Sequence, residues 1–141
     1  MGQLIGVGYE GLTISEYIQV LRDLQVSTLV DVRLNATSRK PGFSKTRLKG
    51  YLADAGIPYL HYRELGNHKD NRKGFWDDPS TGSHVQSVNH FKNLILCDDY
   101  KVSLLNNLKN MSQCENVALL CYEKAPEKCH RTVLIELIRE M

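Results

Sequence analysis

The sequence predicts an α/β protein with a mainly parallel sheet of about four to five strands and helices on both faces, as in Rossmann-like folds. Short apolar runs alternate along the chain with segments whose apolar residues recur at helical spacing. In addition, Thr28–Val32 is rich in β-branched and apolar residues without polar alternation, which is typical of a strand covered on both faces. This order of strands and helices favours parallel pairing through right-handed crossovers.

The first strand and the first helix are predicted near the N-terminus. Leu4–Val7 is a short apolar run that ends at a glycine-rich turn. Thr13 and Glu16 follow with the spacing of a capping box, and apolar residues then recur every three or four positions. We therefore expect a strand, a turn and a helix in this order.

A second helix and a third strand are predicted after Thr28–Val32. Ser44 is suited to the N-terminal cap of a helix, which should run to about Ala55 because Gly56 is a common stop signal. Ile57–Tyr62 then has the composition of a short strand.

The second half of the chain begins with a long polar stretch. Arg63–Ser87 has little apolar periodicity, so we predict a functional loop or a disordered segment there. Helices are expected over His90–Leu96 and Lys101–Met111. The fourth strand is expected over Val117–Tyr122, and a last helix over Thr132–Arg139.

Length and charge limit the functional classes. At 141 residues the chain fits a single domain, residues 1–141, with one hydrophobic core. Its 18 basic and 16 acidic residues give a net charge of +2, which argues against a polybasic membrane binder or a nucleic-acid coat protein. The N-terminus lacks the features of a signal peptide, and no apolar run approaches the roughly 18 residues of a membrane span. We expect a cytoplasmic protein with no membrane partner, whose oligomeric state the sequence leaves open.

The four cysteines lack the dense framework of a small secreted domain, so reduced thiols are expected. A metal site would need three or four convergent ligands. Cys121, Cys129 and His130 could be grouped with His61 or His68. However, their spacing differs from that of zinc fingers and ribbons, and adjacent helical residues point about 100° apart. The sequence therefore predicts no metal and no cofactor.

Reactive side chains are densest in the segment Cys121–Arg131, which follows an apolar strand and leads into a helix. Ligands of open α/β sheets bind at such junctions, where unpaired N–H groups of the helix favour negative charge. Cys121 is the leading candidate nucleophile, because this position and the cations Lys124 and Arg131 would lower the pKa of its thiol. Cys129 is the alternative nucleophile. The alternative is a purely structural role, in which Cys121 is only a small buried apolar residue.

Parallel pairing would bring the carboxyl ends of the strands to one edge, with Gly8, Tyr9, Asp31 and Arg33 beside the Cys121–Arg131 segment. Asp31 is costly to bury unless it is paired, and Arg33 lies two residues later on the same face. The two residues are expected to form a structural ion pair or, with equal weight, to face a ligand.

Two further patterns are weak. Gly6–Gly11 fits the Gly-x-Gly-x-x-Gly spacing of dinucleotide-binding turns, but Gly6 falls where the strand should still be running, so nicotinamide binding is not favoured. Basic residues also gather after the second and third strands, with Phe43, Tyr51, Phe75 and Trp76 between them. They could hold a phosphate, a nucleotide or a single strand, although a solvated basic surface is commoner. The basic residues concerned are Arg33, Arg39, Lys40, Lys45, Arg47, Lys49, Arg63, Lys69, Arg72 and Lys73.

Short motifs that follow one another along nearly the whole chain resemble the signature series of the DUF488 family. The most specific are the paired motifs Cys121-Tyr122-Glu123 and Cys129-His130-Arg131 at the end. The others are Gly6 to Gly11, Val30 to Arg33, Ser38-Arg39 with Phe43-Ser44, Gly56 to Tyr59, and Leu65-Gly66. This resemblance implies an α/β domain with a shared polar site, and no established reaction. The family pattern commonly has a proline after Asp-Val-Arg, where this chain has Leu34-Asn35.

We therefore expect a small enzyme that acts on an anionic substrate in a cleft at the carboxyl ends of the strands. The substrate would be a phosphorylated small molecule, a nucleotide or a nucleic acid. The candidate catalytic residues are Cys121, Glu123 and His130. The candidate substrate-binding residues are Gly8, Tyr9, Asp31, Arg33, Ser38, Arg39, Tyr59, Cys129 and Arg131. The alternative is a non-catalytic module that binds nucleotides or nucleic acid and has structural cysteines.

Overall fold

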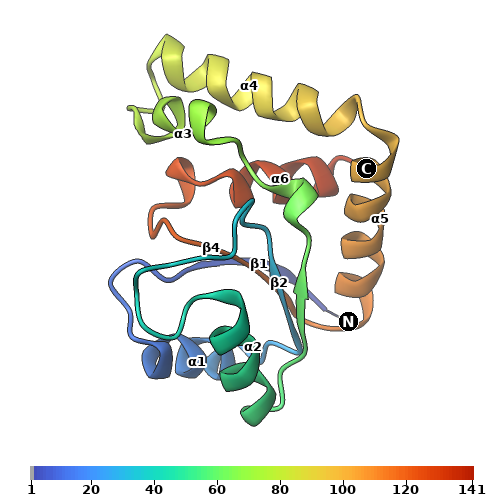
Figure 1. Ribbon diagram of the computed structural model, residues 1–141. Helices are drawn as coiled ribbons and strands as arrows, with labels where there is room; N and C mark the ends of the chain where they lie inside the picture. The colour runs from blue at the N-terminus through green and yellow to red at the C-terminus, as the bar shows by residue number, and fades with distance from the viewer. Residues whose placement is uncertain (1) are drawn as a thin grey trace.

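The computed structural model describes residues 2–141 and is built on a four-stranded, all-parallel sheet (Figure 1). The predicted α/β class is confirmed. The strands lie side by side in the order β1-β4-β2-β3. Their bounds are β1 Leu4–Gly8, β2 Thr28–Asp31, β3 Tyr59–His61 and β4 Val117–Cys121.

Strand β4 is last in the sequence but lies between β1 and β2 in the sheet. Gly8 of β1 pairs with Cys121, and Asp31 of β2 pairs with Leu120. The ends of three strands therefore meet around Cys121. The chain leaves β1 and β2 toward one face of the sheet and leaves β4 toward the other, which makes this a topological switch point where α/β proteins bind ligands.

One face of the sheet is covered by helices α1 (Ile14–Asp23) and α2 (Lys45–Asp54), drawn in blue and green in Figure 1. The predicted capping box at the start of α1 is confirmed: the Thr13 hydroxyl accepts the Glu16 N–H at 3.2 Å, and the Glu16 carboxylate accepts the Thr13 N–H at 2.9 Å. The buried side chains that form this half of the core include Val7, Tyr17, Leu21, Leu29, Leu48, Leu52, Ala118 and Leu120.

Helices α5 (Asp99–Cys114) and α6 (His130–Arg139) pack on the other face. Helices α3 (Lys69–Trp76) and α4 (Gly82–Leu96) lie beyond α6, away from the sheet (Figure 1). Short 3-10 turns occupy Arg63–Leu65 and Pro126–Lys128. Alternate residues of β2 and β4 point into this second half of the core, among them Val30, Leu119 and Cys121. Over residues 2–141, no helix is long and apolar enough to cross a membrane.

The prediction of a loop over Arg63–Ser87 is wrong, because α3 and the beginning of α4 lie there. Helix α3 forms despite its weak apolar periodicity because close contact with α4 stabilises it. Gly74 lies so near Ser87 that an added Cβ would be 1.7 Å from the Ser87 hydroxyl, and the Asn71 amide donates to the Ser87 carbonyl at 2.9 Å. The helices predicted over His90–Leu96 and Lys101–Met111 are present and are longer than expected.

Helix α2 begins after Ser44 and ends at Asp54 with Ala55 as its C-cap, close to the predicted end, and Gly56 adopts a left-handed φ of 75°. The expected capping bond from Ser44 is absent. The Ser44 hydroxyl accepts the Ser38 N–H at 3.1 Å and donates to the Ser38 carbonyl at 3.0 Å. It therefore closes the loop after β2 rather than the helix.

Candidate functional site

A cleft of about 340 Å³ opens where β1, β4 and β2 end, at the place predicted for a site. Its lining comes from the segments after these strands, from α3 and from the beginning of α6. The lining residues are Tyr9, Arg33, Leu34, Asn35, Thr37, Asn67, Arg72, Phe75, Trp76, Cys121, Tyr122, Glu123, Lys128 and His130.

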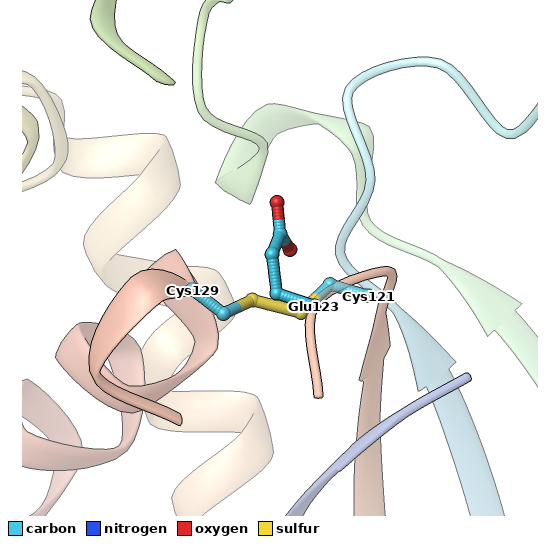
Figure 2. A group of neighbouring side chains, drawn as sticks. All are labelled: Cys121, Glu123 and Cys129. Atoms are coloured by element: carbon cyan, nitrogen blue, oxygen red, sulfur yellow. A yellow bond between two sulfur atoms is a disulfide. The ribbon is translucent and has the colours of Figure 1, made fainter. Parts of the chain in front are cut away.

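Cys121, at the end of β4, is joined by a disulfide to Cys129, the residue that precedes α6 (Figure 2). The expectation of four reduced thiols is therefore wrong for this pair. The chain turns back through the 3-10 turn at Pro126–Lys128, which brings the two sulfurs together although eight positions separate them. Cys97 and Cys114 are free and exposed. Both linked cysteines are at most 2% exposed, and only Cys121 lines the cleft.

Arg131 lies beneath the cleft with its guanidinium against Cys121. Its Nη1 is 2.9 Å from the Cys121 Sγ and also donates to the Glu123 carbonyl. Its Nη2 donates to the Lys124 carbonyl at 3.3 Å. Among residues 2–141, no carboxylate oxygen lies within 4.0 Å of this guanidinium, which is buried. Burial lowers the pKa of Arg131, an effect that the charges of Tyr17 and Glu123 partly oppose.

The glycines of β1 explain how Arg131 reaches Cys121. A Cβ on Gly6 would be 2.7 Å from the Arg131 Nε, and a Cβ on Gly8 would be 2.0 Å from the Glu123 carbonyl oxygen. The Gly-x-Gly pattern that mimics a dinucleotide turn therefore makes room for a side chain and a backbone segment of the protein itself. The Tyr9 and Glu10 N–H groups continue the pairing with the Cys121 and Tyr122 carbonyls, at 3.2 and 2.9 Å, and fix this segment.

Arg33 is a second buried arginine, at the end of β2, and it forms a bidentate pair with Asp31. Its Nε and Nη2 donate to the two Asp31 carboxylate oxygens at 2.9 and 2.7 Å. Its Nη1 donates to the Phe43 carbonyl at 2.7 Å and to the Tyr9 hydroxyl at 3.3 Å. Burial alone would lower the pKa of Arg33, but hydrogen bonds and charge attraction from Asp31 outweigh it and raise the pKa. Of the two roles considered for Asp31, the structural ion pair is present.

Tyr59 of β3 completes this group from the side away from the cleft. Its hydroxyl donates to Asp31, and burial together with this hydrogen bond raises the pKa of Tyr59. Asp31 is therefore fully engaged by Arg33 and Tyr59. It supports Arg33 and does not line the cleft.

His130 begins α6 at the wall of the cleft. Its Nε2 lies 2.8 Å from the Val32 carbonyl, which can only accept, so Nε2 carries the proton and Nδ1 has a free lone pair. That Nδ1 is 3.9 Å from the Cys129 Sγ. Burial lowers the pKa of His130, which favours the neutral ring. The ring can therefore accept a proton on the side of the disulfide.

Glu123 rises from the segment between the two cysteines, as Figure 2 shows. The Trp76 indole N–H donates to its carboxylate at 3.1 Å, so α3 and the β4 end are linked across the cleft. Three potential metal ligands lie within 4.8 Å of one another: one atom each of Cys121, Glu123 and Cys129. The disulfide takes both thiolates, and the Arg131 guanidinium touches Cys121, so this arrangement does not favour a cation. We do not assign these residues as metal ligands.

The predicted site residues fall into three groups. Tyr9, Arg33, Cys121, Glu123 and His130 line the cleft. The predicted residues packed beneath or behind this lining are Gly8, Asp31, Tyr59, Cys129 and Arg131. Ser38 and Arg39 do not line the cleft.

Several lining residues escaped the sequence analysis as site residues. Lys128 was outside the noted basic group, although it lies in the Cys121–Arg131 segment already singled out. Asn67 fell in the segment predicted as a loop, and no local pattern identifies it; the Asn71 amide of α3 donates to its side chain at 3.1 Å. Phe75, in the same segment, was noted only among the aromatic residues between the basic ones.

No curated protein and no solved structure matches this chain. A family model does match it: over residues 13–138 the chain fits the model of the domain of unknown function DUF488. The matched range contains Arg33, the Cys121–Cys129 pair and Arg131, whose geometry is described above. These residues and the matched range bear out the resemblance seen in the motifs, and the chain belongs to the DUF488 family.

Proposed function

We propose that this chain is an enzyme that acts on an anionic substrate in the cleft, with the thiolate of reduced Cys121 as the nucleophile. The observation that carries the proposal is the 2.9 Å contact between the Arg131 Nη1 and the Cys121 Sγ at the cleft floor. A buried guanidinium favours negative charge on an acidic group that touches it, and the thiolate is the nucleophilic form of cysteine.

The cations that remain free in the cleft support an anionic substrate. Arg72 and Lys128 both line the cleft, and neither has a carboxylate oxygen within 4.0 Å in the described part of the chain. Arg33 is neutralised by Asp31, so its role is to hold the cleft wall. A phosphorylated small molecule or a nucleotide fits this charge pattern, and a nucleic acid is a further candidate.

Glu123 and His130 supply proton transfer in this proposal. The Glu123 carboxylate is half-buried beside Cys121, where it can protonate a leaving group or accept a proton. The neutral His130 has its free Nδ1 on the sulfur side. Tyr9 lines the cleft beside Arg33 and orients the substrate.

Alkylation of the reduced protein tests the proposal. We expect Cys121 to react with iodoacetamide near pH 7 about tenfold or more faster than Cys97 and Cys114, because only a thiolate attacks. The ratio of the rate with iodoacetate, which is anionic, to the rate with iodoacetamide should also be higher at Cys121 than at the two exposed cysteines. Peptide mass spectrometry after timed quenching gives the rate at each site.

Two charge variants sharpen this test. Arg72→Gln and Lys128→Gln should remove the preference of Cys121 for iodoacetate, whereas Lys49→Gln on α2, outside the cleft, should not. Equally slow labelling of Cys121, Cys97 and Cys114 would show that Cys121 is only a buried apolar residue.

A binding module with structural cysteines is the second candidate, because the disulfide is buried and two exposed aromatic rings border the cleft. Trp76 is 51% exposed and Tyr122 is 48% exposed, and both are suited to stacking on bases. Binding of a short single-stranded oligonucleotide that falls with salt and survives both Cys121→Ser and Glu123→Gln would favour this function.

A further inference from the structure

The two linked sulfurs have different surroundings, and this difference gives each a distinct role. Cys121 forms part of the cleft floor, whereas Cys129 lies behind it at the N-terminus of α6. A substrate in the cleft therefore meets Cys121 first. Cys129 can reach only the Cys121 sulfur, to which it is bonded here. This is the relation between an attacking and a resolving cysteine.

Each of the two sulfurs also has its own neighbouring side chain: Arg131 contacts Cys121, and His130 lies beside Cys129. Arg131 touches Cys121 and, in the disulfide form, donates only to neutral groups: one sulfur and two carbonyl oxygens. Opening of the disulfide provides this buried cation with a thiolate as its counter-ion. The free Nδ1 of His130 faces Cys129 at 3.9 Å, where it can take the proton of the second thiol.

The cleft indicates the chemical class of the electron acceptor. At about 340 Å³ it has the size of a small-molecule pocket. The cations Arg72 and Lys128 are available for carboxylates of a ligand, and Trp76 and Tyr122 offer apolar surface for its carbon chain. A small disulfide that carries carboxylates matches both the sulfur chemistry of the floor and the charge of the walls.

We infer that Cys121 and Cys129 form a dithiol–disulfide couple that reduces small acidic disulfides in this cleft. The inference rests on the proposed function, since it uses the same cleft and the same nucleophile.

The reaction balances as two successive thiol–disulfide exchanges. The Cys121 thiolate attacks one substrate sulfur, so that a Cys121–substrate disulfide forms and the first substrate thiolate leaves and takes up a proton. Cys129 then gives its proton to His130 Nδ1 and attacks the Cys121 sulfur, and the second substrate thiolate leaves and receives that proton. Two electrons and the proton of Cys129 pass from the protein to the substrate, and the proton taken up by the first substrate thiolate comes from solvent, because Cys121 reacts as a thiolate. The product is the Cys121–Cys129 disulfide of this structure, and a dithiol reductant of small-molecule or protein type returns it to the dithiol.

Three disulfides of similar size and different charge test the inference. The full chain with Cys97→Ser and Cys114→Ser is reduced, freed of reductant and mixed under anaerobic conditions with dithiodipropionate, hydroxyethyl disulfide or cystamine. Each rate is divided by the rate of the same disulfide with a free small thiol, which removes differences in intrinsic reactivity. We expect the acidic disulfide to exceed the basic one by about tenfold or more at low salt, and the advantage to shrink with added salt.

The products distinguish the roles of the two cysteines. The reduced protein should end as the Cys121–Cys129 disulfide with both substrate thiols released. Cys129→Ser should stop at a stable mixed disulfide on Cys121, and Cys121→Ser should leave Cys129 unreacted on the same timescale. Equal normalised rates for dithiodipropionate and cystamine, or a mixed disulfide that persists in the protein with both cysteines, would overturn the inference.

The outcome also separates the two proposals. If Cys121 is alkylated rapidly with a preference for iodoacetate but exchanges with no disulfide faster than a free thiol does, the proposed function stands and the dithiol–disulfide couple fails. If Cys121 shows neither property, both proposals fail.

Discussion

Two buried arginines lie at neighbouring strand ends, and they are treated in opposite ways. Arg33 at β2 has a bidentate carboxylate partner in Asp31, and its pKa is raised. Arg131, beside the end of β4, has a sulfur and two carbonyls but no carboxylate within 4.0 Å over residues 2–141, and its pKa is lowered. The charge of Arg33 is therefore neutralised within the fold. The second arginine retains a capacity for negative charge at the cleft floor, which supports the proposal that Cys121 is the reactive group.

The largest effect on stability should come from breaking the ion pair between Arg33 and Asp31. Asp31→Asn leaves the Arg33 guanidinium buried without a countercharge, so we expect a loss of about 3–5 kcal/mol in the free energy of unfolding. Urea denaturation of the disulfide form measures it. Tyr59→Phe removes one hydrogen bond to the same carboxylate and should cost only about 1 kcal/mol. A loss from Asp31→Asn no larger than that from Tyr59→Phe would mean that the ion pair contributes little.

Crowding of the β1 glycines should have the next largest effect. Gly8→Ala places a Cβ 2.0 Å from the Glu123 carbonyl oxygen, so the segment after β4 must shift, at a cost of about 1–3 kcal/mol. The same variant should slow alkylation of reduced Cys121, since Arg131 donates to that carbonyl. Gly50→Ala, in α2 with open space around it, is the control and should be neutral or stabilising by up to about 1 kcal/mol. A Gly8→Ala protein as stable as the control would contradict the close approach.

His130 should make stability depend on pH in a smaller way. Its pKa in the folded state lies below the ordinary value of 6.5, so the unfolded chain binds the proton more readily. The contribution of His130 is therefore complete above about pH 6.5 and declines as the pH falls toward the folded pKa. We expect His130→Gln to reduce the loss of unfolding free energy between pH 7 and pH 5. An unchanged pH dependence in this variant would show that burial does not penalise the protonated ring.

The smallest expected effect is spectroscopic. Trp76 is the only tryptophan, and its indole donates to Glu123 across the cleft. Binding of a nucleotide or of inorganic phosphate beside Arg72 and Lys128 should therefore change its emission, and Glu123→Gln should alter the change. Emission that is constant with every anion would indicate that the cleft does not bind them.

The fold was predictable because its signals are local. The capping box of Thr13 and Glu16 and the apolar run of β4 each report on their own segment, and parallel pairing follows from their order. Helix α3 was missed because its stability comes from Gly74 and Asn71 fitting against α4, which leaves no periodic pattern. The disulfide was not predicted because the expectation of reduced thiols rested on the cellular compartment. That expectation carries no information on how close Cys121 and Cys129 lie in the fold.

The site was predictable to the extent that strand ends converge. Tyr9, Arg33, Cys121, Glu123 and His130 were all brought to one cleft by the parallel sheet. The Asp31–Arg33 ion pair was one of the two roles predicted for these residues, because a carboxylate two residues away is visible in a sequence. That no carboxylate oxygen lies within 4.0 Å of Arg131 over residues 2–141 was not predictable, because it depends on residues that come close only in space. The reason for the two glycines of β1 was also not predictable: Gly6 makes room for the Arg131 side chain, and Gly8 makes room for the backbone at Glu123.

The most direct test of the contrast between the two arginines is the pH at which reduced Cys121 forms a thiolate. It is measured by ultraviolet absorbance in a chain where Cys97, Cys114 and Cys129 are serines. With Arg131 present, the midpoint should lie below the value of about 8.5 that is usual for a free cysteine, and Arg131→Gln should move it upward. A midpoint at or above the usual value that Arg131→Gln does not change would contradict the account.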